Sequence, residues 1–559
     1  MGTATGREHA QGPLRPLRER PFLDLWVAAL VSNVGTWMGN VGAAWYMASL
    51  SDSPLVVSLV QSATYLPVAM VGLFAGALAD VVDRRRLLLA TQTGMMVSAA
   101  LLAAATFMGL VTPALLLTLT FLFGLAFAFN GPASKAVIDD LVPARQLPAA
   151  VALNGVVVNI GRAAGPALAG VLIAGAGPGA VFAVNALSFV GALVVLARWR
   201  RPTPQAPDPR ERVSEAVFAG VRFVRFSPHM TAVLVRTAAF IASGSALWAL
   251  IPIVARQELS LESTGYGALL AFFGIGTVGW TGIRDRVEER LSPETLVSSA
   301  TILFALTMAT VAVVRSLSVL YLAMTVGGIA WIALLTSFNV ATQTAVAGWV
   351  RARGLAAFQT VFMIGMGGGG AIWGAVAQRW GVRAALLSGA AGVALGLLTR
   401  LRWPMADLSR LDLSMVGDPG PTPADLGDDP PRGQVLVTVE YTVDADDAQE
   451  FLRLSQQLEP ARRRTGATRW ELFQDTDRPS RFVEQFVVRS WSAHLRQHEL
   501  ISATDRALEE RVWQLHAGDT PPPTWHMLQV DGRAPLRPQQ LNATDGGRDR
   551  PGSDDAPDG

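Results

Sequence analysis

Apolar stretches long enough to cross a lipid bilayer recur through the first 400 residues of this chain. A membrane-spanning helix needs about 20 mainly apolar residues and must satisfy its own backbone hydrogen bonds. One group of stretches precedes a polar interval near residue 200, and a second group follows it. They lie at 24–49, 55–79, 87–110, 113–138, 147–174 and 178–198, and then at 230–255, 264–284, 294–314, 317–344, 354–378 and 382–402. The pattern predicts an all-α membrane protein of twelve transmembrane helices in a 6+6 arrangement.

The composition changes sharply after the last of these stretches. Only 16% of all residues are charged, against about a quarter in soluble proteins, whereas the chain beyond Trp403 is rich in Asp, Arg, Glu and Pro. We therefore expect at least two domains. The chain has no cysteine, which excludes disulfides and Cys-based metal sites. The predicted divisions are an N-terminal segment (1–21), a six-helix bundle (22–198), a loop (199–228), a second bundle (229–403), a linker (404–433), a soluble domain (434–531) and a disordered tail (532–559).

Arginines orient the predicted helices. They gather in alternate connections, whereas the other connections of the first half are short and nearly uncharged. The positive-inside rule therefore places both termini and the 199–228 loop in the cytoplasm, in a multi-pass protein of the cell membrane. Valines spaced from Val213 to Val224 predict an amphipathic helix in that loop. The apolar run after Phe22 is too long for a signal-peptide core, so no cleavable signal is expected. The orienting arginines are Arg15, Arg18, Arg20, Arg84–Arg86, Arg198, Arg200, Arg201, Arg284, Arg286, Arg290, Arg351, Arg353, Arg400 and Arg402, with Arg256, Arg315, Arg379 and Arg383 as exceptions.

Two local motifs carry a family resemblance. The segment from Gly76 through Asp80 to Arg84 and Arg85 is similar to the cytoplasmic G-x-x-x-D-R-x-G-R-R signature of the major facilitator superfamily, although Val81 and Asp83 replace its usual Arg and Gly. The resemblance implies a charge lock between helices that opens and closes during alternating access. The segment Gly161-Arg-Ala-Ala-Gly165-Pro166-Ala-Leu-Ala-Gly170 resembles the superfamily's antiporter motif, which is associated with exporters. Alternatively, its glycines form only a packing seam.

Further stretches resemble one branch of the superfamily. The runs Leu30–Trp45, Asn130-Gly-Pro-Ala and Leu147–Asn159 are similar to the enterobactin-exporter-like branch, which handles siderophores and drugs. This resemblance covers nearly the whole chain. It implies a transporter rather than an enzyme, with a small-molecule substrate, no cofactor and no nucleic-acid partner.

Polar residues within the predicted helices are candidates for substrate contacts, because a polar group in the membrane is costly unless it is paired or faces water. In a transporter of this architecture they would face a cavity between the two halves. The alternative is hydrogen bonding between helices, at about 1 kcal/mol for each bond. Arg162 is the strongest candidate, because an unpaired cation is the hardest to tolerate there. The candidate set is Asn33, Trp37, Asn40, Gln61, Asn130, Asn159, Arg162, Asn339 and Gln343.

Acidic residues are missing from the middle of every predicted helix. Proton-coupled transport usually needs a titratable group that reaches both sides, and the best candidates are Asp24 and Asp139, near the cytoplasmic helix ends. No nucleotide-binding P-loop is present, which argues against an ATP-driven pump. The superfamily resemblance implies proton antiport, but no residue clearly performs it.

The region after residue 433 has the pattern of a small α+β domain. Strands are predicted at 435–443, 468–474, 482–488 and 525–530, with helices at 445–464 and 490–516, the βαββαβ order of a ferredoxin-like fold. The domain resembles the antibiotic-biosynthesis-monooxygenase group, whose members often pair, so a homodimer through this domain is expected. His494 and His498 lie four residues apart on one helical face, a metal-binding spacing, but no third ligand can be assigned, and no metal site is predicted.

Three functions follow from these patterns. The favoured one is a secondary active transporter that exports a small amphipathic molecule, such as a siderophore, drug or metabolite, by alternating access. The second is a membrane-anchored enzyme or sensor whose C-terminal domain carries the activity. The third is an importer of the same fold.

Overall fold

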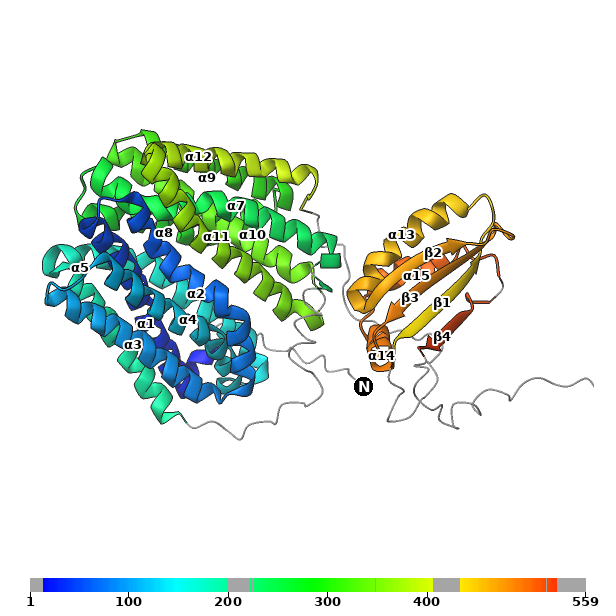
Figure 1. Cartoon of the computed structure of the whole chain (residues 1–559). Coiled ribbons are helices and arrows are strands. Elements are labelled where there is room, and N and C mark those ends of the chain that lie inside the picture. Colours follow the sequence, from blue (N-terminus) through cyan, green and yellow to red (C-terminus); the bar gives the residue numbers. More distant parts are fainter. Residues whose placement is uncertain are drawn as a thin grey trace, which may run out of the picture. The chain divides into compact units, whose positions relative to one another are not determined.

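A computed structural model describes residues 14–199, 222–223, 225–346, 348–405, 433–518 and 520–529. The chain divides into two compact units, Met1–Leu411 and Asp412–Gly559, which are treated separately below (Figure 1). The predicted amphipathic helix around Val213–Val224, most of the 404–433 linker and the 532–559 tail lie outside the described residues.

The first unit consists of helices. After a short turn, η1 (Arg15–Arg18), its first half contains α1 (Arg20–Leu50), α2 (Pro54–Val81), α3 (Arg84–Phe107), α4 (Pro113–Leu141), η2 (Ala144–Gln146) and α5 (Leu147–Arg198). Its second half contains α7 (Pro228–Ile253), η3 (Val254–Glu258), α8 (Ser263–Glu288), α9 (Pro293–Val313), α10 (Leu317–Thr344), η4 (Gly348–Val350), α11 (Arg351–Trp380), α12 (Val382–Leu395) and η5 (Gly396–Leu401).

Local sequence explains where several of these helices begin. Ser53, Thr112, Ser227 and Ser292 each precede a proline and accept a hydrogen bond from a backbone N–H in the first turn of the helix that follows. A hydroxyl at this position satisfies a backbone donor that has no partner within the helix. Proline fits the first helical position because it has no N–H to satisfy.

α5 is 52 residues long and is broken near its middle. Gly177 has φ 77° and ψ 170°, a conformation that an L-residue with a side chain rarely adopts, and Pro178 follows it. Proline removes a backbone donor, so the chain bends here. The break separates residues 147–176 from 178–198, which corresponds to the predicted boundary between two spans.

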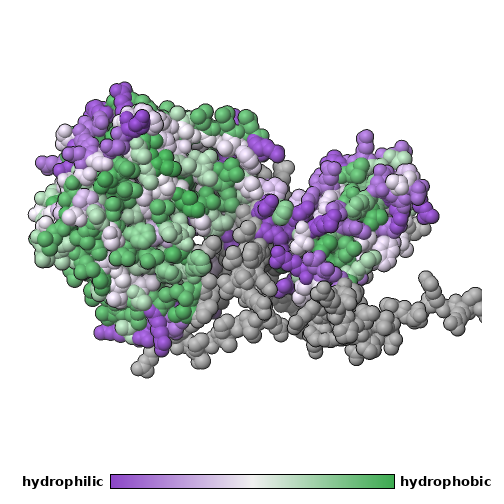
Figure 2. All heavy atoms as spheres, in the orientation of Figure 1, coloured by the Kyte–Doolittle hydropathy of each residue, from purple (hydrophilic) through white to green (hydrophobic). Residues whose placement is uncertain are grey.

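Ten of the described helices are long and apolar enough to cross a membrane, with α5 counted once. The 31-residue α1 is not among them, because polar residues such as Asn33 and Asn40 lower its hydropathy. Hydrophobic residues cover most of the face of this unit that Figure 2 shows, and hydrophilic residues gather at its margins. The protein is therefore a multi-pass membrane protein, as predicted.

The two helical halves meet along two helix pairs. α5 packs against α8, and α2 packs against α11. Glycines make both contacts close: a Cβ at Gly170 would lie 2.8 Å from the backbone oxygen of Ser263, and one at Gly370 would lie 2.8 Å from that of Ser58. Small residues allow such backbone approach between membrane helices.

The second unit contains a four-stranded sheet with helices. Its elements are β1 (Val435–Thr442), α13 (Ala448–Thr465), β2 (Ala467–Gln474), β3 (Arg481–Val488), α14 (Trp491–Glu499), α15 (Ala503–Trp513) and β4 (Thr524–Leu528). The strand order is β2-β3-β1-β4, and every neighbouring pair is antiparallel. The second predicted helix is divided at Ser502, whose side chain caps α15. The core contains alternate residues of β1 and β3, packed against Phe451 and Leu454 of α13.

Candidate transport cavity

A cavity of about 780 Å³ lies between the two helical halves of the first unit. Residues of α1, α2, α4 and α5 form one side of it, and residues of α7, α8, α10 and α11 form the other. A smaller pocket of about 90 Å³ shares Arg162 and several neighbours with it. The large cavity has a size that is typical of sites for small organic molecules.

Arg162 lies in the wall of both hollows. Its guanidinium carbon lies 5.4 Å from the ring centroid of Trp37 in α1, within the range of a cation–π interaction. Its Nη1 is buried and has no hydrogen-bond partner. Tyr65 of α2 also lies in the wall of both hollows. The cation is therefore held by aromatic surface and keeps a donor free.

The glycines of the proposed antiporter motif position this arginine. A Cβ at Gly161 would overlap Asn33 Oδ1, and one at Gly165 would lie 2.5 Å from Trp37 Cβ. Both glycines therefore allow α1 to approach α5 closely at the level of Arg162. Gly170 and Pro166 face Gly267 of α8 instead. The motif thus packs α5 against both α1 and α8.

The structure brings most of the predicted substrate contacts together, but not all of them. Asn33, Trp37, Asn40, Asn159, Arg162 and Asn339 contribute to the large cavity. Gln61 contributes to the smaller pocket, where its Nε2 donates to the backbone oxygen of Met366 at 2.6 Å. Buried Asn33 Oδ1 and Gln61 Oε1 lack hydrogen-bond partners, so each can still accept one.

Asn130 and Gln343 lie apart from this cavity. Asn130 Oδ1 accepts hydrogen bonds from Thr91 and Gln92 of α3, and it faces a separate pocket within the first helical half. Gln343 is exposed and donates to Asn339 Oδ1 at 2.6 Å. The role of both residues in substrate contact stays a prediction, with hydrogen bonding within the fold as the alternative.

Aromatic residues that the sequence did not single out form the other wall. Trp331 contacts Trp248 and Phe362, with ring centroids 5.5 Å and 6.3 Å away, and all three residues border the cavity. An aromatic residue within an apolar helix gives no sequence signal that separates a cavity wall from a packing contact. Among the described lining residues the charged ones are Arg162 and Arg284, and none is acidic. The cavity is therefore aromatic and cationic.

The two halves are held together at one end of the cavity. Ser53 donates to Gln378 at 2.8 Å, Gln257 donates to the backbone oxygen of Asp52 at 3.3 Å, and Trp45 stacks on Tyr266 with centroids 5.3 Å apart. This end carries the connections between α1 and α2 and between α11 and α12. The large cavity extends toward the opposite end, where Asn339 and Gln359 line it.

The residues of the predicted charge lock lie at the end of α2 and the start of α3. Arg85 donates to the backbone oxygens of Leu196 and Ala197, at 2.8 and 2.6 Å, and so caps the end of α5. Asp83 caps α3 by accepting from the backbone N–H of Arg86. Gly76 and Asp80 lie in α2, and the side chain of Asp80 falls outside what the structure describes. In this conformation Arg85 binds helix carbonyls.

The two predicted proton-coupling residues are not seen at the cavity. Asp24 is exposed near the start of α1, and the side chain of Asp139 lies outside the described part of α4. Their role stays a prediction.

Two helical halves around a central cavity are the architecture of a membrane transporter that works by alternating access. The chain belongs to the transmembrane secretion effector family of major facilitator transporters, whose model matches residues 11–534 and so spans both units. This confirms the superfamily resemblance that the motifs indicated.

Similar proteins include a staphyloferrin A transporter and a multidrug efflux pump. The staphyloferrin A transporter of Staphylococcus aureus is 22% identical over 299 residues, which are 53% of this chain and 74% of that protein. The multidrug efflux pump Tap of Mycobacterium bovis is 25% identical over 423 residues, 72% of this chain and 98% of that pump. Among solved structures, a bacterial homologue of the human lysosomal transporter Spinster, in an inward-facing and unoccupied conformation, superposes with a TM-score of 0.55 at 15% identity, over 70% of this chain and 96% of that one.

Proposed function

We propose that this protein is a twelve-span secondary transporter that exports a bulky amphipathic molecule with an anionic group from the cytoplasm. The count of twelve follows if the two parts of α5 cross the membrane separately and α1 is added to the ten apolar helices. α1 is less apolar because its polar side chains face the cavity, as is common for helices that line a transport path.

The free donor of Arg162 is the observation that carries the substrate proposal. A buried cation without a carboxylate partner is costly in a membrane, and the described cavity wall supplies none. A carboxylate or other anion on the substrate would pair with Arg162 when it binds. The aromatic wall around Trp331 and the amides of Asn40 and Asn159 suit the apolar and polar parts of the same molecule.

The export direction rests on two supports. Relatives in the family include pumps named for efflux, such as Tap, and the Gly161–Gly170 segment resembles the antiporter motif. With both termini in the cytoplasm, as the arginine distribution predicts, the joined end of the bundles faces outward and the cavity faces the cytoplasm. A transporter in that state is ready to load cytoplasmic substrate. Asp80, Arg84 and Arg85 would then act in gating, and Asp24 or Asp139 in proton coupling.

Everted membrane vesicles test the proposal directly. We expect vesicles with the wild-type chain to accumulate the anionic aromatic dye carboxyfluorescein, but not cationic ethidium, when a proton gradient is imposed. Arg162→Ala should lower carboxyfluorescein uptake about 10- to 100-fold, because a hydrogen bond to a charged group contributes about 1.5–3 kcal/mol. Arg379→Ala, at an exposed arginine of α11, is the control and should leave uptake unchanged.

The same assay separates the alternatives. Accumulation only in right-side-out vesicles would indicate an importer. If Arg162→Ala leaves transport intact while deletion of residues 434–531 abolishes the activity, the export proposal fails and the tethered enzyme or sensor is favoured. The secretion or resistance phenotype of a deletion strain would then narrow the substrate class.

The C-terminal unit would be a ferredoxin-like domain that pairs with a second copy. The sheet face away from α13 has a pocket whose apolar lining includes Phe473 and Met527, which are 47% and 52% exposed. Its other lining residues are Leu436, Val487 and Leu528 and the polar Gln434, Arg469, Glu471, Gln485 and Gln529. Apolar residues on an open sheet face favour covering by a partner. Size-exclusion chromatography with light scattering on the full chain tests this pairing, which Phe473→Glu should weaken.

A further inference from the structure

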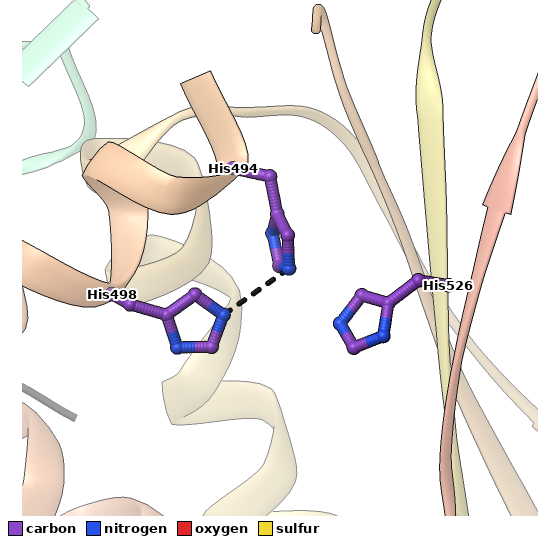
Figure 3. A group of neighbouring side chains, drawn as sticks. All are labelled: His494, His498 and His526. Carbon is purple, nitrogen blue, oxygen red and sulfur yellow. Dashed lines mark hydrogen bonds between the residues drawn. The ribbon is translucent and has the colours of Figure 1, made fainter. Parts of the chain in front are cut away.

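Three histidines from two separate elements converge in the C-terminal unit (Figure 3). His494 and His498 lie one turn apart on α14, and His526 projects toward them from β4. One ring nitrogen from each lies within 4.8 Å of the other two. Nε2 of His494 and Nε2 of His498 are 3.1 Å apart, and the ring centroids of His494 and His526 are 4.7 Å apart.

The surroundings hold these rings in place. His494 is only 1% exposed, and Trp491 packs against both His494 and His526, with ring centroids 5.6 and 5.8 Å apart. Burial, together with the neighbouring His498 and His526, lowers the pKa of His494 to about 3.

A buried glutamine completes the arrangement. Gln497 Nε2 donates to Thr465 Oγ1 at 3.0 Å and to the backbone oxygen of Arg462 at 3.3 Å, which leaves its Oε1 buried without a partner. His494 Nδ1 is also buried without a hydrogen-bond partner, and Gln497 follows His494 by three residues on the same helix, α14. A proton on Nδ1 that is shared with Gln497 Oε1 would leave the lone pair on Nε2. Metal-binding histidines are usually oriented in this way by a second hydrogen bond.

We propose that His494, His498 and His526 bind a divalent transition metal ion of the Zn²⁺ class. Imidazole nitrogens are preferred ligands of such ions, and three histidines leave a fourth tetrahedral position for water or another ligand. With metal–nitrogen bonds near 2.0–2.1 Å, tetrahedral ligand nitrogens lie roughly 3.3 Å apart. The observed separations are close enough that small side-chain rotations complete the site.

A metal ion here would join an edge strand to a helix. β4 lies at one edge of the sheet and pairs only with β1 among the described strands. Coordination would link β4 to α14, and the free energy of metal binding would add to the stability of the unit. This inference does not depend on the proposed transport activity.

Zinc titration of the full chain tests the site. The chain contains six histidines and no cysteine, so it is purified with a histidine-free tag, stripped with a chelator and titrated with Zn²⁺ by calorimetry. We expect one tightly bound Zn²⁺ per chain. His526→Ala should weaken binding by about 100-fold or more, because even outer-shell changes cost about 10- to 100-fold. His516→Gln, in the same unit but outside the cluster, should bind Zn²⁺ like the wild type.

A spectroscopic variant keeps the test decisive if His526→Ala folds poorly. His498→Cys replaces one ligand with another in a chain that otherwise lacks cysteine, and His498 is half-buried. With Co²⁺ this variant should gain a near-ultraviolet thiolate-to-metal charge-transfer band that the wild type lacks. The proposal is overturned if wild-type chain retains no Zn²⁺, if His526→Ala binds it with unchanged affinity, or if the His498→Cys complex shows no such band.

Discussion

Two largely buried arginines, one in each unit, have opposite surroundings. Arg462 of α13 is 12% exposed and pairs with two carboxylates, Glu484 of β3 at 3.1 Å and Glu509 of α15 at 2.7 Å. Glu484 also accepts hydrogen bonds from Trp470 and Tyr441. Arg162 in the membrane unit has an aromatic ring beneath it and a buried nitrogen without a partner.

The difference separates a structural charge from a charge that awaits a ligand. Around Arg462, each carboxylate is neutralised within the fold, so the cluster ties α13 to β3 and α15. Around Arg162, the fold provides Trp37 and a cavity and no described carboxylate. A protein can retain such an unpaired cation at the cost of stability when function requires it. Substitution of Arg462 should therefore lower stability, whereas substitution of Arg162 should lower transport.

The largest effect is expected at Arg462. Arg462→Met leaves Glu484 buried without its cation, whereas Glu509 keeps its pairing with Arg506 at 3.4 Å. Removing one partner of a buried charge pair costs about 3–5 kcal/mol. In the full-length variant, backbone amides of residues 433–529 should exchange hydrogen faster than in the wild type. Arg453→Met, at an exposed arginine paired with Glu450, should leave exchange unchanged. Equal protection in both variants would contradict the structural role of this cluster.

Arg162→Met should produce the reverse pattern. We expect uptake of carboxyfluorescein to fall about 10- to 100-fold, while the melting temperature of the full chain in detergent stays the same or rises, because an unpaired buried cation is removed. Arg162→Lys, which keeps the charge, should retain part of the uptake. A lowered melting temperature with normal uptake would place Arg162 among the structural charges.

The sequence could reveal Arg162 because a cation within an apolar span is conspicuous by itself. The sequence also predicts the spans, their break near Gly177 and the strand pattern after residue 433, because each depends on local periodicity and turn residues. The cavity wall around Trp331 was not visible, because it depends on which face of a helix meets the other half. His526 was missed for the same reason. It reaches His494 through the pairing of β4 with β1, which no local spacing encodes.

Arg236 provides an intermediate case within the membrane unit. This arginine of α7 is 4% exposed and pairs with Glu294 at the start of α9, which is 29% exposed and also accepts from the backbone N–H of Met405. Arg236→Met should destabilise the unit by about 1–2 kcal/mol, less than a fully buried pair, because solvent screens Glu294. The measurement is thermal melting in detergent, with Arg379→Met as the exposed control. Transport at permissive temperature should be unchanged. A transport defect without a loss of stability would show that Arg236 acts in transport.

The smallest effect is expected at Arg481, which is paired like Arg462 but is 39% exposed. Its guanidinium lies 2.8 Å from Glu440 and 2.9 Å from Asp475, and the hydrogen bonds that it donates lower the pKa of both carboxyls. A lowered folded-state pKa contributes stability above the ordinary carboxyl range near pH 4, and this contribution is lost as the pH falls through the folded-state pKa.

Arg481→Gln should thus lower the melting temperature of the C-terminal unit slightly at pH 7, and the difference from wild type should shrink as the pH falls below about 4. Arg489→Gln, at an exposed arginine just past the other end of β3, is the control. A difference that is independent of pH would show that Arg481 acts through packing rather than charge. The greater exposure of Arg481, and not its pairing, would then distinguish it from Arg462.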